Sequence, residues 1–358
     1  MVKYDRYLDY QLGRNSPRQV FVDADGVAIF GTLQFLRASL DGTLVRKVPY
    51  PTDPANGVVF PPFAVAQAAG AYGLVFASYS AWSGATFCVF RGDAPIDLST
   101  CAKIPTPWGS AIPTWDGSAY RVYARLDDHT MFLSRYDPNG AFVDQVTFPT
   151  IDPNPGGWPL FVGPNAFIFA ATWRPNKCTS DFLYVMPRSL DTTALRIFDL
   201  LPPDAIDVAI PQLASSGRRA AFIYGAVCAT PYPEGGCAAG YPSYVTGTYV
   251  TVTQDDGTPL PRRQVFGAPQ PVIWDGARFV HLNGLPLGGH GGMGVNVFDE
   301  NNVALVENAR LPLAWEQGHS ADEAGTRIAA VGVNDYIVAY ALVDNGETRI
   351  ARFSLPTP

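Results

Sequence analysis

Residues 112–149, IPTWDGSAYRVYARLDDHTMFLSRYDPNGAFVDQVTFP, form the stretch that decides the fold. Four short segments of alternating or apolar residues are separated by three turn signals: Asp116-Gly117, Asp127-Asp128-His129 and Asp137-Pro138-Asn139-Gly140. This pattern predicts four antiparallel strands, which we name a, b, c and d. Because one such sheet cannot bury both of its faces, we expect it to stack on copies of itself.

The same unit recurs along the whole chain. The a–b turn returns at 25–26, 69–70, 116–117, 163–164, 216–217, 275–276 and 334–335, so the repeats are 44 to 59 residues apart. The c–d turn returns near six aspartates, which are Asp41, Asp93, Asp137, Asp191, Asp255 and Asp299. Repeats of this length with four strands each are typical of a β-propeller.

Seven a–b turns but only six c–d turns predict how the ring closes. The last repeat ends after strand c, and the segment Tyr4–Leu12 precedes the first strand a. We therefore predict an all-β, seven-bladed β-propeller with four antiparallel strands per blade, in which residues 4–12 supply the missing outer strand of the last blade. We expect a single domain over residues 1–358, with blades that begin near residues 18, 62, 111, 159, 209, 270 and 327.

The repeat resembles a known class of proteins. Thr114–Val122 and Ile273–Val280 each contain Trp-Asp-Gly, followed after two further residues by an aromatic residue. Tyr136–Val143 carries the pattern D-x-x-G-x-apolar. Such units resemble the propeller repeats of secreted or envelope proteins from GC-rich bacteria. The resemblance implies a fold, because propellers of this kind serve many functions.

Composition narrows the classes of function. The net charge of -7 argues against nucleic acid as a partner, since nucleic-acid binding depends on basic patches. No run of apolar residues is long enough to span a membrane as a helix. We read two short basic pairs, Arg218-Arg219 and Arg262-Arg263, as solvated surface residues.

Four of the five cysteines form two close pairs. Cys88 and Cys101 flank a turn in which they are directly opposite each other, and Cys228 and Cys237 bracket a loop rich in glycine and proline. We predict two disulfides, with free buried thiols as the alternative. The protein is then extracytoplasmic, either periplasmic or secreted, if both disulfides form and cytoplasmic otherwise.

The loops predict where ligands bind. In a propeller, the a–b and c–d turns share one face, which we call the turn face, and the b–c loops and d-to-a connections share the other, which we call the connection face. Long loops fall on the connection face, where function usually lies in a rigid scaffold. Five tryptophans on this face are candidate ligand-binding residues because they can form the walls of an aromatic pocket: Trp82, Trp108, Trp158, Trp173 and Trp315. Arg174 and His129 are candidates on the same face. The alternative is that each tryptophan caps the core of its blade, which is how we read Trp115 and Trp274.

Histidines offer a second interpretation. His290, His319 and Glu316 fall in the same set of loops, and His281 is expected near that face. These residue types suit acid–base catalysis or a divalent metal, although no fixed ligand spacing supports a metal.

Three functions stay open at this point. The preferred one is a binding module, without cofactor, for a small molecule, peptide or glycan. The second is a hydrolase or lyase that acts on a peptide or natural product, and the third is a scaffold for another protein.

Overall fold

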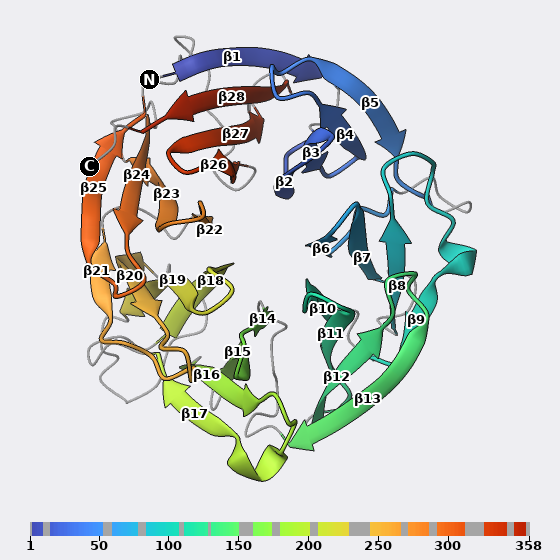
Figure 1. Cartoon of the computed structure of the whole chain (residues 1–358), viewed down its shortest axis with the longest axis vertical. Helices are drawn as coiled ribbons and strands as arrows, with labels where there is room; N and C mark the ends of the chain where they lie inside the picture. The colour runs from blue at the N-terminus through green and yellow to red at the C-terminus, as the bar shows by residue number, and fades with distance from the viewer. Residues whose placement is uncertain are drawn as a thin grey trace.

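A computed structural model of the chain describes residues 2–9, 15–52, 59–77, 84–106, 111–127, 130–149, 160–173, 180–200, 207–228, 244–265, 271–285, 292–311, 326–341 and 347–355. Within these ranges the chain forms seven four-stranded antiparallel sheets around a central axis (Figure 1). The prediction of an all-β propeller with seven blades is therefore confirmed. The described residues contain no helix long and apolar enough to cross a membrane.

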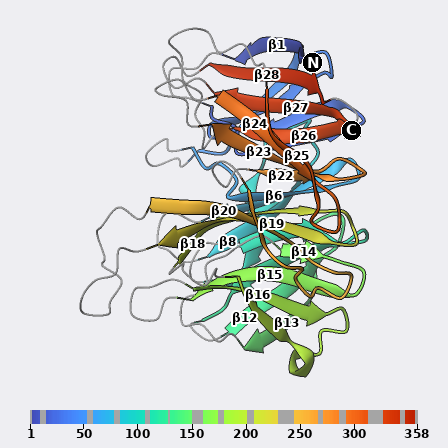
Figure 2. The same ribbon diagram turned by 90° about the vertical axis from the view of Figure 1, so that its left-hand side faces the viewer.

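The blades follow one another along the chain, and Figure 2 shows the same ring from the side. Blades 1 to 3 are β2–β5 (Gln19–Asp23, Gly26–Phe30, Gln34–Ala38, Leu44–Pro49), β6–β9 (Ala64–Ala68, Ala71–Ala77, Ala85–Phe90, Ala102–Ile104) and β10–β13 (Ala111–Trp115, Tyr120–Arg125, Thr130–Tyr136, Phe142–Pro149). Blades 4 and 5 are β14–β17 (Leu160–Val162, Ala166–Trp173, Ser180–Pro187, Arg196–Asp199) and β18–β21 (Asp207–Ser215, Ala220–Cys228, Tyr244–Val252, Arg263–Val265). Blades 6 and 7 are β22–β25 (Val272–Trp274, Phe279–Leu285, Gly292–Phe298, Ala304–Arg310) and β26–β28 (Arg327–Gly332, Asp335–Ala341, Thr348–Ser354) with β1 (Val2–Asp9).

Local sequence explains why the turns fall where they do. Gly117 and Gly276, which follow Asp116 and Asp275, have φ angles of 96° and 102°, a region that side chains disfavour. Each aspartate accepts hydrogen bonds from the amides two and three residues ahead, which closes the turn between strands a and b. The Asp-Gly pairs therefore mark real hairpins.

The N-terminal strand closes the ring. β1 pairs antiparallel with β28, with Tyr4 opposite Arg352 and Arg6 opposite Ile350. Lys3 Nζ also lies 2.9 Å from the Asp335 carboxylate of β27. Both ends of the chain thus contribute to one sheet, in which β1 is the outer strand and covers the edge of β28. The predicted closing strand is confirmed, shifted slightly toward the N-terminus.

The core is divided into seven apolar clusters, one between each pair of neighbouring blades. Between blades 2 and 3, for example, Val75 and Phe87 pack against Tyr120 and Val122, and all four are fully buried. Between blades 7 and 1, Ile337 packs against Val27, which completes the circle. Burial between blades, rather than within one blade, therefore holds the ring together.

One of the predicted disulfides lies within the described residues. Cys88 ends up opposite Cys101 because β8 and β9 pair Ala85 with Ile104 and Phe87 with Ala102. The two cysteines are disulfide-bonded, with Cα atoms 4.8 Å apart. Cys237 lies outside the described residues, so the Cys228–Cys237 pair stays a prediction.

Candidate functional site

The described residues enclose a hollow central channel. Two adjoining cavities of about 620 and 730 Å³ share Gln19, Phe21, Phe63 and Ile273 among their lining residues, so they form one continuous space. Its walls come from the first strand of most blades, because strand a of each sheet lies nearest the axis (Figure 1). The channel runs from the connection face to the turn face, as these strands do.

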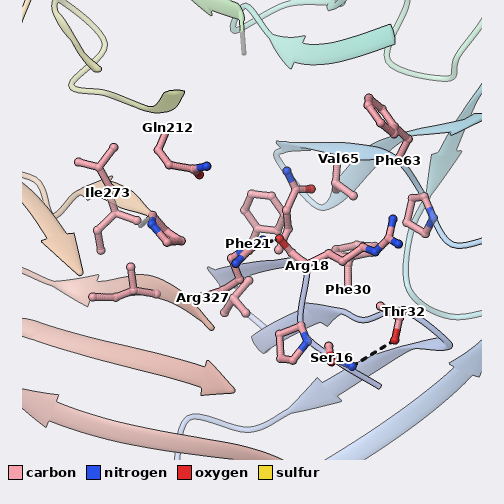
Figure 3. A pocket seen from close by; sticks show the side chains of 17 residues that line it. Ser16, Arg18, Phe21, Phe30, Thr32, Phe63, Val65, Gln212, Ile273 and Arg327 are labelled. Atoms are coloured by element: carbon pink, nitrogen blue, oxygen red, sulfur yellow. Dashed lines mark hydrogen bonds between the residues drawn. The ribbon is translucent and has the colours of Figure 1, made fainter. Parts of the chain in front are cut away.

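The channel mouth lies at the connection face. Its lining residues precede or begin strand a, as Ser16, Arg18 and Phe63 do, or lie between strands b and c, as Thr32 does. Figure 3 shows Arg18, Phe63, Gln212 and Arg327 around this cavity. A hydrogen bond of 3.1 Å from the Ser16 amide to the Thr32 hydroxyl fixes one side of the rim. The sequence analysis did not single out these residues, because no motif marks them.

Charge and exposed apolar surface meet at the mouth. The Phe63 side chain is 46% exposed, which is unusual for phenylalanine. The backbone N–H of Arg18 donates a hydrogen bond of 2.7 Å to the carbonyl oxygen of Phe30. The Arg18 guanidinium makes no hydrogen bond or ion pair with the described residues. Arg327 instead donates to the carbonyl oxygens of Arg18 and Thr326, at 2.5 and 2.7 Å. Arg327 thus holds the rim in place, while the Arg18 guanidinium has no such partner among the described residues and lines the cavity.

Three glutamines place amide groups in the channel, beside other polar lining residues such as Thr114 and Ser215. Gln19 and Gln67 project from β2 and β6, and Gln212 from β18. The Gln19 Oε1 atom is buried and accepts no hydrogen bond from the described residues. Gln67 donates to the Val22 carbonyl at 3.0 Å, which fixes its orientation. An unpaired buried acceptor carries a cost that a bound donor can remove.

Tryptophans line the other end of the channel. Trp115 and Trp274 occupy equivalent places, each at the end of strand a, and each packs on the first aromatic of strand b with ring centres 4.8 Å apart. Both are only partly buried and border the larger cavity. Their interpretation as core residues is therefore incomplete, because strand a faces the channel.

Most predicted site residues cannot be placed. Trp173 ends β15, but its side chain is outside the description, and the other candidates lie outside the described residues altogether: Trp82, Trp108, Trp158, Arg174, Trp315, His129, His290, His319 and Glu316. The aromatic pocket and the histidine site therefore stay predictions. Among the residues that the structure does describe, no three His, Cys, Asp or Glu side chains gather as a metal site.

His281 was wrongly expected near the connection face. It is the third residue of β23, is fully buried, and its Nδ1 lies 3.1 Å from Asn296 Nδ2. A buried and hydrogen-bonded histidine of this kind serves the structure of its blade.

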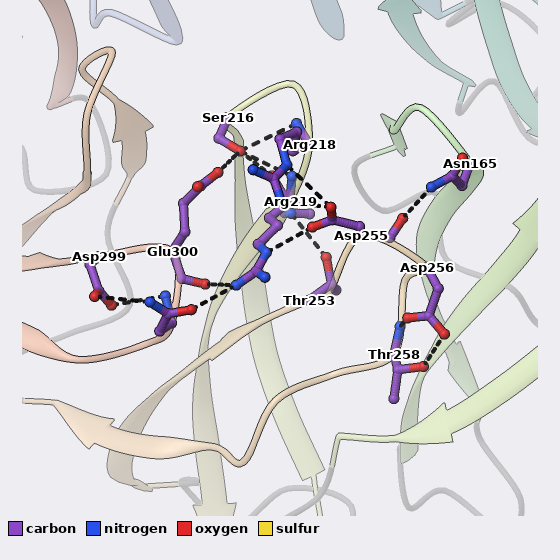
Figure 4. A network of polar contacts seen from close by, with 12 residues as sticks. Asn165, Ser216, Arg218, Arg219, Thr253, Asp255, Asp256, Thr258, Asp299 and Glu300 are labelled. Carbon is purple, nitrogen blue, oxygen red and sulfur yellow. Dashed lines mark hydrogen bonds and ion pairs between the residues drawn. The ribbon is translucent and has the colours of Figure 1, made fainter.

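The basic pairs are also not simply solvated. Arg219 Nε lies 3.0 Å from Asp255 and its Nη1 donates to the Glu300 carbonyl at 2.6 Å, while Arg218 Nη2 lies 2.7 Å from Asp255 (Figure 4). Arg263 forms an ion pair with Glu307. Arg219 thus links the a–b turn of blade 5 to the c–d turn of blade 6 on the turn face, while the Arg263–Glu307 pair links the outer strands β21 and β25. Arg218 and Arg262 are exposed, as the sequence analysis expected, but the ion pairs were not foreseen because the partners are in other parts of the chain.

Comparison with known proteins places the fold but not the activity. No family model matches the chain, and no curated protein matches its sequence. YCF48 bound to a D1 peptide is similar, with a TM-score of 0.55 at 9% identity over 99% of this chain and 97% of that chain. A lignostilbene dioxygenase from Pseudomonas brassicacearum gives 0.53 at 10% identity over 99% and 92%, and a chain of a mitotic checkpoint complex gives 0.53 at 9% over 100% and 96%. At such low identity the likeness establishes the propeller fold alone, and the resemblance to bacterial repeat proteins stays a prediction.

Proposed function

We propose that this propeller is a ligand-recognition module, and that a small molecule, peptide or glycan binds at the connection-face mouth of its central channel. The observation that carries the proposal is the meeting of three features in one hollow: the Arg18 guanidinium, the exposed Phe63 ring and the buried Gln19 oxygen, which has no hydrogen-bond partner in the part of the chain that the structure describes. Concave sites with apolar walls and a few converging polar groups are typical of ligand sites.

The chemistry of the mouth favours a short peptide over the other ligand classes. Arg18 supplies donors for a carboxylate or carbonyl, and Gln19 supplies an acceptor for an amide N–H. Phe63 and Phe21 offer apolar surface to a side chain between them. YCF48 is a precedent for a propeller of this shape bound to a peptide. The predicted tryptophans would extend the same site outward.

The disulfide found among the described residues supports a location outside the cytoplasm. Cys88 and Cys101 are bonded in a short connection, and such bonds persist in oxidising compartments. We therefore propose a periplasmic or secreted module.

Peptide binding tests the proposal directly. Purified protein would be titrated with a random hexapeptide pool, bound peptides would be identified by mass spectrometry, and the best one measured by calorimetry. Phe63→Ala and Arg18→Gln are each expected to weaken binding at least tenfold, because each removes a group that faces the cavity.

A matched phenylalanine provides the control. Phe142 on the outer strand β13 is 56% exposed and distant from the channel in the ring, so Phe142→Ala should leave binding unchanged. Equal affinities for Phe63→Ala, Phe142→Ala and the parent protein would overturn the channel mouth as the site. Binding of a glycan or small molecule but of no peptide would keep the site and change the ligand class.

A further inference from the structure

Three blades carry an aspartate at one equivalent position on the turn face. Asp23, Asp116 and Asp275 each lie where strand a passes into the turn. Each is paired across the turn with the residue three positions later, at or just before the start of strand b. In blade 2 the same register pairs Ala68 with Ala71. Ala68 therefore stands where these blades have a carboxylate.

Two of these aspartates connect their blade to the next one. Tyr72 of blade 2 donates its phenol to Asp23, and Tyr336 of blade 7 donates to Asp275 at 2.6 Å. An arginine from the blade of the aspartate completes each group, and both of its contacts are close. Arg37 Nη1 lies 2.6 Å from Asp23 and its Nη2 3.2 Å from the Tyr72 hydroxyl. Arg278 lies 3.2 Å from Asp275 and 3.1 Å from the Tyr336 hydroxyl.

A third tyrosine lacks this partner. Tyr120 of blade 3 lies near the start of strand b and packs against blade 2, as Tyr72 and Tyr336 pack against the blades before them. Its side chain is fully buried, yet its hydroxyl makes no hydrogen bond with the described residues. Blade 2 offers Ala68 there, so the acceptor is missing. The junction of blades 3 and 4 differs, because Phe167 of blade 4 stands where the other junctions have a tyrosine. Arg121, which pairs with Asp116, has its guanidinium over the Phe167 ring.

A cavity of about 410 Å³ occupies the place of the missing carboxylate. It is lined by Ala68, Arg91, Trp115, Ser118 and Tyr120, among others. Arg91 belongs to blade 2, which would carry the acid, and it is exposed, with one nitrogen 3.2 Å from the Asn139 side chain. Burial raises the pKa of Tyr120 to about 12, and the nearby positive charge of Arg91 opposes that rise. The phenol is thus a neutral donor at any physiological pH.

We propose that this cavity between blades 2 and 3 is a binding site for a carboxylate from another molecule. The carboxylate accepts a hydrogen bond from the Tyr120 hydroxyl and forms an ion pair with Arg91. The bound group takes the place that Asp23 and Asp275 fill at the other two junctions. Trp115 and Pro138 give the site apolar walls for the carbon chain that carries the carboxylate. The site lies on the turn face, so it is separate from the proposed peptide site at the opposite end of the channel.

The carboxylate can come from a free acid or from an acidic side chain of a peptide, and the probes separate these sources. Acetate and benzoate would be titrated at constant ionic strength and pH 6.5, beside a short peptide with an acetylated N-terminus, an amidated C-terminus and one glutamate, and the same blocked peptide with glutamine. Binding would be followed by the shift of the Tyr120 ring signals in NMR and by melting temperature. We expect saturable shifts of the Tyr120 signals with a free acid, with the glutamate peptide or with both, and none with the glutamine peptide, whose binding at the channel mouth would change the melting temperature alone.

Variants make the test specific. Tyr120→Phe and Arg91→Gln are each expected to weaken carboxylate binding at least fivefold. Ala68→Asp should supply the carboxylate from within the chain, raise the melting temperature and abolish binding of the added acid. In the double variant Ala68→Asp with Tyr120→Phe, the gain in melting temperature should be largely lost.

The proposal is overturned by any of three results. These are no saturable binding of acetate, benzoate or the glutamate peptide to the parent protein, undiminished binding in Tyr120→Phe, or undiminished binding in a folded Ala68→Asp variant. The channel-mouth variant Phe63→Ala should bind carboxylate as the parent does, so failure of one site leaves the other standing.

Discussion

The phenol of Tyr336 donates a 2.6 Å hydrogen bond to the carboxylate of Asp275, which belongs to the neighbouring blade and has a fully buried side chain. The Arg278 guanidinium contacts both groups. A charge-assisted contact of this kind joins two sheets whose main cohesion is apolar, and it fixes their relative position at the turn face.

The first prediction compares two tyrosines. Tyr336→Phe should lower the free energy of unfolding by about 1.5–3 kcal/mol, because it removes a donor from a buried carboxylate. Tyr120→Phe should change it by less than about 0.5 kcal/mol, because the Tyr120 hydroxyl has no partner in the described part of the chain. Urea denaturation of both variants measures the difference. Equal losses would show that the hydroxyl contacts do not matter.

The second prediction concerns acid. Burial by itself raises the pKa of Asp116, but hydrogen bonds from Arg121, Ser118 and Ala119 outweigh it and bring the pKa to about 2. The pKa of Asp275 is lowered in the same way, against its burial, by Tyr336 and the turn donors. Because these folded-state pKa values lie below the unfolded ones, the stability they contribute is complete above about pH 4 and is lost as pH falls toward 2.

Melting temperature measured between pH 2 and pH 7 checks this sign. Asp116→Asn should melt lower than the parent at pH 6 and show a smaller further loss on acidification, since the titrating group is gone. The exposed turn residue Asp93 serves as control, and Asp93→Asn should follow the parent curve. A melting temperature that rises on acidification would contradict the prediction.

The third prediction concerns the disulfide. The bond between Cys88 and Cys101 closes a short loop, with a sequence separation of 13. Replacement of both cysteines by alanine should destabilise the protein by about 2–4 kcal/mol, largely through the unfolded chain. Melting curves with and without reductant measure the effect. In the double variant, reductant should no longer lower the melting temperature by breaking this bond. Mass spectrometry after alkylation also tests whether Cys228 and Cys237 form the second predicted disulfide.

The fourth prediction concerns ring closure. Removal of residues 1–9 should expose the edge of β28 and cause aggregation in size-exclusion chromatography, because an unpaired strand edge recruits other chains. A synthetic peptide of residues 2–9 added in trans should restore the monomer in part. If the shortened chain stays monomeric and melts like the parent, β1 does not close the ring in solution.

The fifth prediction addresses the residues that the structure leaves undescribed. If the protein is a binding module, paired substitutions such as Trp82→Ala with Trp315→Ala should weaken ligand binding and leave the melting temperature nearly unchanged. If it is a hydrolase or lyase, a pH-dependent activity should be found that is lost in His290→Ala or His319→Ala. Full activity in both histidine variants would remove that alternative.

The sequence by itself determined the repeat and hence the architecture. Asp-Gly turns at regular spacing and strands of alternating polarity depend on local backbone preferences, so a few neighbouring residues are enough to identify them. The missing last strand was also visible, because the chain shows seven a–b turns but six c–d turns. Even the opposition of Cys88 and Cys101 followed from counting across one hairpin, as the register of β8 and β9 bears out.

Only the tertiary structure decided which residues meet between blades. Asp275 and Tyr336 are 61 positions apart, and nothing local marks them as partners. The same holds for Arg219 with Glu300, for the polar groups around the channel mouth, and for the vacancy at Ala68 beside Tyr120. Hairpin geometry is encoded by neighbours in the chain, whereas contacts between blades depend on the curvature and spacing of the whole ring. The fold could therefore be read from its repeats, and the sites could not.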